Sequence, residues 1–166
     1  NLPGQAHAYV LRSPHAHARI LDIDSRAAAA GDGVLAVYTA ADLAADGVGD
    51  LPPFYLPAPP ECDVVFASGQ PILARGRVRH IGQPVAFVVA ETADAARAAA
   101  ERVEMSVEAL PAVTDTAEAD RPGAPQIWDE APGNVAYTFE KGDRAAVDAA
   151  FAAAAHVTEV ALVNSR

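Results

Sequence analysis

The chain has little of several residue types, and each shortage excludes a class of protein. It holds one cysteine, Cys62, so it forms no internal disulfide and no four-cysteine cluster of its own. No apolar run approaches the roughly 18 residues that a membrane-spanning helix needs. Basic residues number 12 against 22 acidic ones, and the formal net charge is −10. That balance argues against nucleic-acid binding, because phosphate contacts need a positive field.

The length of 166 residues suits one domain with a substantial core. A chain of this size buries roughly 70% of its unfolded surface. We therefore predict a single domain over residues 1–166, with an irregular, proline-rich segment at about residues 46–74. Five of the ten residues from Leu51 to Pro60 are proline, which disfavours helix and strand. A loop of this length is usually functional, interfacial or mobile.

The segment from Val78 to Val113 predicts a strand, a helix and a second strand with short connections. Val85 to Ala90 is a continuous apolar run, typical of a strand buried on both faces. Thr92 stands at the position of a helix N-cap, and Ala93 to Val103 follows without glycine or proline. Its alanine stripe lets that helix lie close on a sheet. Met105 to Leu110 has the period of a strand, and a parallel pairing of the two strands would require a right-handed crossover.

Further elements are predicted on both sides of this segment. Residues 6–11 and 18–24 predict a hairpin around a Ser-Pro-His turn. A short helix at 26–30, a strand at 34–38 and a helix from Thr39 through Leu43 follow.

Near the end of the chain, a strand at 134–140, a helix at 144–155 capped by Asp143 and a strand at 156–163 repeat the strand–helix–strand plan. The predicted packing face of that helix consists of Val147, Ala150, Phe151 and Ala154. The whole pattern predicts an α+β fold with a mixed β-sheet, two main packed helices at 93–103 and 144–155, and additional short helices.

Four segments, in their order and spacing, resemble one enzyme family. They are Arg12–Ile20 (RSPHAHARI), Gly33–Leu43 (GVLAVYTAADL), Gly82–Ala86 (GQPVA) with Glu91-Thr92 after it, and Leu110–Val113 (LPAV). They resemble the N-terminal α/β-hammerhead domain of the molybdenum-cofactor large subunit of the xanthine dehydrogenase, aldehyde oxidase and carbon monoxide dehydrogenase family. Each segment alone is a weak signal, whereas four in the family's order are a strong one. The strand after the helix departs from the family pattern at Ser106-Val107.

The resemblance implies an α/β-hammerhead fold that is a fragment of a longer chain. Family members oxidise aldehydes, purines, other N-heterocycles or carbon monoxide at a molybdenum–pterin centre, and electrons leave through two [2Fe–2S] clusters, generally to FAD. The pterin loops and the catalytic glutamate of the family lie downstream of this domain, so no catalytic, cofactor-binding or metal-binding residue is assigned here. Expected partners are the remaining domains of the large subunit and the iron–sulfur and FAD subunits of a bacterial, cytoplasmic enzyme.

Two histidines and the single tryptophan invite a functional interpretation. His15 and His17 would lie on one side of an extended segment, as ligands of a metal do. The sequence places no third ligand nearby, so histidines that bond to backbone or water are the favoured interpretation. Trp128 is expected to anchor the second irregular region on the core. Cys62 has no evident base beside it and is not expected to act as a nucleophile.

Arginines alternate at positions 75, 77 and 79, so on a strand they would form one basic edge. A solvated edge that discourages sheet-to-sheet pairing is the favoured interpretation, and contact with an acidic partner subunit is the functional alternative. The candidate residues for that partner contact are Arg75, Arg77, Arg79, Gly82, Gln83 and Pro84.

Two other functions stay open. A biotinyl or lipoyl carrier needs an exposed lysine in a tight hairpin, commonly between two methionines. The single lysine, Lys141 in Glu140-Lys141-Gly142-Asp143, has no methionine beside it. The other open function is that of a free-standing ligand-binding module. The reading frame downstream of Arg166 would distinguish such a module from a large-subunit domain.

Overall fold

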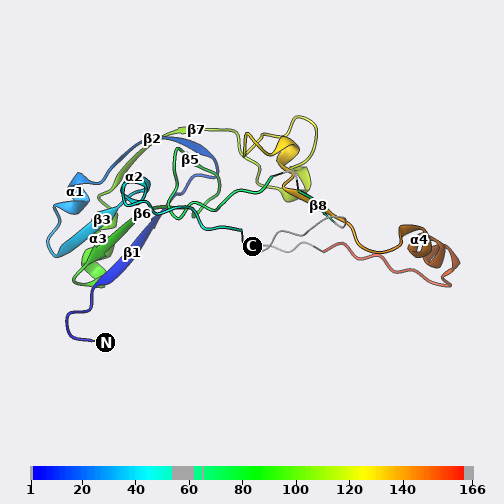
Figure 1. Cartoon of the computed structure of the whole chain (residues 1–166), viewed down its shortest axis with the longest axis horizontal. Coiled ribbons are helices and arrows are strands. Elements are labelled where there is room, and N and C mark those ends of the chain that lie inside the picture. Colours follow the sequence, from blue (N-terminus) through cyan, green and yellow to red (C-terminus); the bar gives the residue numbers. More distant parts are fainter. Residues whose placement is uncertain (1, 54–61, 65, 163–166) are drawn as a thin grey trace.

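The computed structural model describes residues 2–53, 62–64 and 66–162. Its strands are β1 (His7–Arg12), β2 (Ala18–Asp24), β3 (Val34–Tyr38), β4 (Cys62–Val64), β5 (Arg77–Val78), β6 (Pro84–Ala90), β7 (Glu104–Ala109) and β8 (Tyr137–Phe139). Its helices are α1 (Arg26–Ala29), α2 (Ala40–Ala45), α3 (Ala93–Ala100) and α4 (Arg144–Ala153), with the 3-10 turns η1 (Thr116–Glu118) and η2 (Pro132–Asn134). The elements α1, β3 and α2 therefore lie where the sequence predicts them (Figure 1).

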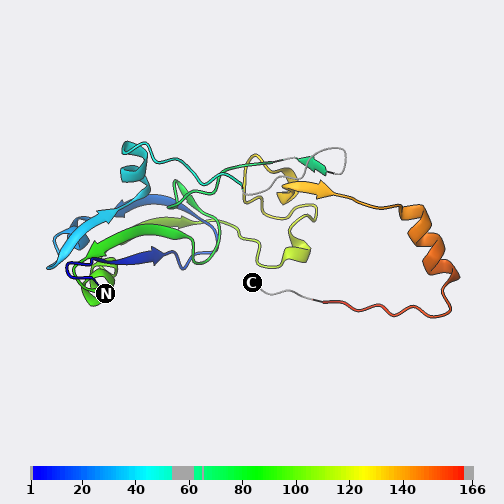
Figure 2. The same cartoon turned by 60° about the horizontal axis from the view of Figure 1, so that its bottom comes forward.

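Two three-stranded sheets form the body of the molecule (Figures 1 and 2). One has the order β1-β6-β3 and the other the order β5-β2-β7, while β4 and β8 make a separate pair. Every strand pair among the described residues is antiparallel. The predicted α+β class is confirmed. The parallel pairing of the strands that flank α3 does not form, because β6 and β7 lie in different sheets.

Helix α3 covers one face of the β1-β6-β3 sheet with small side chains. Thr92 caps it as predicted, since its Oγ1 accepts a hydrogen bond from the Ala95 N–H at 3.1 Å. Such a cap stabilises a protein by about 1 kcal/mol. The buried cluster between the helix and the sheet consists of Ala28, Val88, Ala99 and Ala100. The predicted alanine stripe is confirmed, although the helix ends at Ala100, before the predicted end at Val103.

Strands β1 and β2 do not form the predicted hairpin. β1 pairs with β6, whereas β2 pairs with β5 and β7. The connection between them bonds to both sheets: the Ser13 N–H donates to the Gln83 carbonyl at 2.9 Å, and the His17 carbonyl accepts from the Leu110 N–H at 3.0 Å. Because these partners come from different sheets, the connection carries the chain from one sheet to the other.

Helix α4 lies away from the body of the molecule (Figures 1 and 2). Asp143 caps it as predicted, accepting from the Ala146 N–H at 2.9 Å. The predicted packing is wrong, because Val147 is 50% exposed and Phe151 60% exposed, and Ala150 and Ala154 are exposed as well. The strand predicted at 156–163 is also wrong over its described part, 156–162, because no described strand pairs with it to complete a ladder.

The predicted irregular segment at 46–74 holds little regular structure where it is described. Its proline-rich stretch lies largely outside the described residues, as does the side chain of Cys62. The backbones of Leu51 and Gln70 exchange two hydrogen bonds, of 2.9 and 2.8 Å, and β4 pairs with β8. β8 covers only Tyr137–Phe139 of the predicted strand at 134–140, and η2 occupies the first of those residues, Asn134. The single domain over residues 1–166 stays a prediction.

Candidate functional site

The turn at Ser13 and the Gly82-Gln83-Pro84 segment lie side by side. Ser13 is 2% exposed, and its carbonyl accepts from the Gly82 N–H at 2.8 Å, complementing the Ser13–Gln83 bond. Arg12 Nη1 donates to the Gly82 carbonyl, also at 2.8 Å. Gly82 has φ +82°, a left-handed conformation that favours glycine. Two segments far apart in the sequence therefore form one hydrogen-bonded unit at the start of β6.

His17 joins the same turn to the end of β7. It is 5% exposed, and its Nδ1 lies 2.7 Å from the Pro111 carbonyl, so Nδ1 carries the proton and donates. Its buried Nε2 has no hydrogen-bond partner among the described residues. The His15 N–H donates to Ser13 Oγ at 3.0 Å. The interpretation of His17 as a backbone-bonded histidine is confirmed, and the described part of the chain brings no three metal-ligating side chains together.

The three arginines hold irregular segments against the body. Arg75 Nη2 lies 3.1 Å from Asp50 Oδ2, and Arg77 Nη1 lies 2.9 Å from Asp129 Oδ1. Arg79 Nε donates to the Ile127 carbonyl at 3.3 Å. β5 spans only two residues, so the predicted solvated basic edge is wrong: the three guanidinium groups point to three different partners in segments 25 to 52 residues away.

Charge and burial shift two pKa values at this junction. The hydrogen bond from Arg77 lowers the pKa of Asp129 below its ordinary value, because it favours the carboxylate form. Burial lowers the pKa of Arg79, and the neighbouring Arg77 adds to the effect. Asp129 and Glu130 oppose that shift through space. An arginine stays protonated regardless, so Arg79 is a partly desolvated cation.

Trp128 anchors the second irregular region, as predicted. The guanidinium carbon of Arg79 lies 3.7 Å from the centre of the Trp128 ring, and Phe66 packs against the same ring at a centroid distance of 5.2 Å. Cation–π contacts of this kind contribute about 0.5–1 kcal/mol at exposed sites and more when desolvated.

A pocket of about 340 Å³ lies beside Trp128, and we call it the Trp128 pocket. It is formed by three parts of the chain: the segment after β4, the turn between β5 and β6, and the connection before η2. Its lining residues are Phe66, Ser68, Gly69, Gln70, Pro71, Arg79, His80, Gln83, Pro84, Ile127 and Trp128. Of the six residues proposed for partner contact, the pocket includes Arg79, Gln83 and Pro84, while Gly82 bonds to the Ser13 turn.

Asn134 is a structural residue that sequence reasoning missed. Its Oδ1 accepts from the Ile127 N–H at 2.8 Å, and its Nδ2 donates to the carbonyls of Ala119 and Pro125 at 2.7 and 2.9 Å. It is the one non-glycine residue with positive φ in the described ranges, at +57°. Asparagine tolerates that conformation, so the Pro-Gly-Asn sequence was the available signal.

These contacts define a class of protein: an α+β domain in which side-chain contacts hold irregular segments against two antiparallel sheets. A model of the family described as aldehyde oxidase and xanthine dehydrogenase, a/b hammerhead domain, matches residues 1–111. The chain belongs to this family.

Relatives and solved structures agree with that assignment. The chain is 38% identical over 159 residues to the nicotine 6-hydroxylase large subunit of Paenarthrobacter nicotinovorans, covering 95% of this chain and 18% of the relative. It is also 38% identical over 170 residues to the carbon monoxide dehydrogenase large chain of Afipia carboxidovorans, covering 95% and 20%. The crystal structure of a Cu,Mo-CO dehydrogenase superposes with a TM-score of 0.72 at 34% identity, covering 94% and 20%. The chain thus spans about a fifth of the length of these relatives.

Related proteins therefore include molybdenum enzymes and large subunits of complexes. No helix within the described ranges is long and apolar enough to cross a membrane.

Proposed function

We propose that the chain is the hammerhead domain of the large subunit of a bacterial molybdenum hydroxylase, with a structural and partner-contacting role. The whole enzyme would oxidise an aldehyde, a purine or other N-heterocycle, or carbon monoxide in the cytoplasm. The molybdenum–pterin centre would lie in other domains of the large subunit, with [2Fe–2S] clusters and FAD on partner subunits or domains. The names of the relatives support this reaction class.

One observation carries the structural role: the segments that identify the family bond to one another. The turn at Ser13 bonds to Gly82 and Gln83, and His17 bonds to Leu110 and Pro111. Three signature segments therefore use their polar groups to join the two sheets. Groups engaged in this way position elements of a scaffold and are not available to a substrate.

The residues that the structure describes do not provide the ligands of a metal ion. In the described ranges no cluster of three or more His, Cys, Asp or Glu side chains could ligate a metal ion. The orphaned Nε2 of His17 is a single buried nitrogen whose ring already donates to Pro111. We therefore assign no cofactor ligand among the described residues.

The carrier alternative finds little support in the position of Lys141. A carrier lysine stands at the tip of a hairpin, between two paired strands. Lys141 lies instead on the connection between β8 and α4. Mass spectrometry of the protein from its own host tests this directly, since a biotinyl or lipoyl group adds a defined mass.

The proposal predicts that the complete enzyme is catalytically active and that the isolated chain is not. The isolated chain should show no visible absorption and no turnover of aldehydes, purines, nicotine or carbon monoxide. The complete large subunit, assembled with its iron–sulfur subunit, should turn over one of these substrates under the same conditions. Turnover by the isolated chain would disprove the non-catalytic role.

A further inference from the structure

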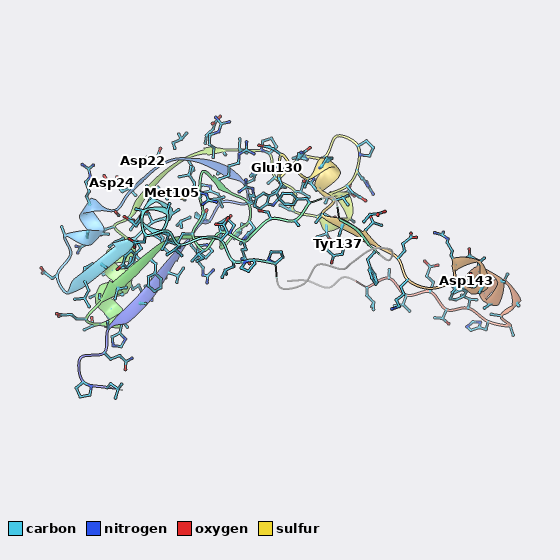
Figure 3. The ribbon with its side chains drawn as sticks, viewed as in Figure 1. Asp22, Asp24, Met105, Glu130, Tyr137 and Asp143 are labelled. Carbon is cyan, nitrogen blue, oxygen red and sulfur yellow. The ribbon has the colours of Figure 1, made fainter. Side chains whose placement is uncertain are left out.

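The Trp128 pocket holds a cation without a carboxylate partner. Arg79 lines the pocket, and among the described residues its Nε donates to a carbonyl while no carboxylate forms an ion pair with it. Of the two carboxylates that act on Arg79, Asp129 forms an ion pair with Arg77. Glu130, next to Asp129 on the connection before η2 (Figure 3), interacts with Arg79 through its charge and forms no ion pair with it. A partly desolvated guanidinium is a strong attractor for an anion that enters the pocket.

Gln83 adds a second donor to the same pocket. It is 6% exposed, and its Oε1 accepts from the Arg79 N–H at 2.7 Å. That bond fixes the orientation of the amide, so its other end is the NH₂ group. Within the described ranges no acceptor bonds to Nε2. Gln83 lines the pocket, and its Nε2 is not among the buried atoms that lack a partner, so this donor faces solvent in the free chain and can bond to an occupant that carries an acceptor.

An exposed apolar side chain follows the pocket residue His80 in the sequence. It is Ile81, which is 68% exposed on the turn that carries Arg79 and Gln83. Pro84 and Trp128 supply apolar walls. Apolar walls around a few polar donors are typical of a pocket that takes a side chain of another polypeptide.

The local charge of the pocket, opposite in sign to the net charge of −10, determines the choice of occupant. The guanidinium of Arg79 makes the pocket locally positive, and a partner carboxylate complements it. We propose that the Trp128 pocket receives an aspartate or glutamate side chain of the iron–sulfur subunit, bound by Arg79 and Gln83, with an apolar neighbour of that residue against Ile81. This inference rests on the proposed function and names the chemistry of its partner contact.

A charge exchange at Gln70 tests the occupant without disturbing the scaffold. Gln70 lines the pocket, its side chain is exposed, and the hydrogen bonds given for it are made by its backbone. In the complete large subunit at low salt, Gln70→Glu should weaken binding of the purified iron–sulfur subunit about tenfold, because like charges repel. Gln70→Lys should bind as tightly as the wild type or more tightly. The difference should shrink at high salt, since exposed charges are screened.

Ala98→Glu is the matched control, because Ala98 is exposed on α3 and the substitution changes the net charge by the same amount. It should leave the affinity unchanged. Equal effects of Gln70→Glu and Gln70→Lys, or tighter binding by Gln70→Glu, would overturn the acidic occupant. So would a lower melting temperature of the uncomplexed Gln70→Glu subunit, which would indicate an occupant from the same chain. If the wild-type subunits do not bind at all, the proposed function itself fails.

Discussion

At the scale of single residues, arginine guanidinium groups join parts of this chain that have no sheet contact. Arg75 and Arg77 form ion pairs with Asp50 and Asp129, and Arg79 stacks on Trp128. Exposed ion pairs contribute little stability individually. Their value here is geometric, since each one fixes a loop whose own sequence specifies no regular structure.

The Arg77–Asp129 pair should make stability depend on pH. The pKa of Asp129 is lowered from 3.8, so its stabilising effect is complete above that value and is lost as the pH falls through the lower pKa of the folded state. Asp129→Asn should therefore destabilise the chain more at about pH 6 than at about pH 3. Urea unfolding, followed by the fluorescence of the single tryptophan, measures the difference. An effect of Asp129→Asn that is equal at both pH values would contradict it.

Local residue roles were predictable from sequence, and long-range ones were not. Thr92 and Asp143 cap helices as predicted, because a cap depends on residues within one turn. The acceptors of the three arginines could not be predicted, because they are chosen by the fold. The partner-contact role of Arg75, Arg77, Arg79, Gly82, Gln83 and Pro84 stays a prediction, although three of the six now line one pocket.

At the scale of elements, α3 and α4 show what periodicity can and cannot establish. Both are alanine-rich helices with an apolar stripe and an N-cap. The stripe of α3 is buried, whereas that of α4 is exposed. Similarly, the apolar run of β6 predicted burial on both faces. Val88 is buried beneath α3, while Phe87 on the opposite face is half-buried in a pocket with Val10 and Tyr38. Periodicity predicts a face but not its partner.

This contrast gives a paired mutational test. Val88→Ala removes two methyl groups from a residue with no exposed surface and should cost about 2 kcal/mol in the free energy of unfolding. Phe151→Ser on α4 should change it by less than about 0.5 kcal/mol. Urea denaturation of both variants gives the comparison. A cost for Phe151→Ser that approaches the cost of Val88→Ala would show that α4 packs in solution.

At the scale of the whole molecule, a two-sheet body continues into an extended part that ends in α4. Figure 3 shows Asp143, at the start of α4, far from Asp22, Asp24 and Met105 of the body, with Tyr137 between them. The class and family were predictable because short segments carried the signal. The division into two antiparallel sheets was not, since it depends on pairings such as β2 with β7, far apart in the chain.

The extended part should be the first to be cut by a protease. Every described residue from 136 to 162 is exposed, and proteases prefer such backbone. Brief trypsin treatment should cleave first after Lys141 or Arg144 and leave a stable body, which mass spectrometry would identify. The arginines in β1, β2 and β5 should be cut later, because their backbones are paired in sheets. A first cut inside one of those strands would contradict the structure.

The contacts of Arg77 and Arg79 also limit where this domain can be cut without loss of structure. The family match ends at residue 111, yet Arg77 and Arg79 reach Asp129, Ile127 and Trp128, which all lie beyond it. A protein cut at that boundary would leave both guanidinium groups without their partners and one wall of the Trp128 pocket missing. We therefore expect the smallest piece that keeps these contacts to be longer than the stretch by which the family is recognised. Excision or grafting of this domain should keep the chain at least through Asn134, whose side chain holds that connection in place.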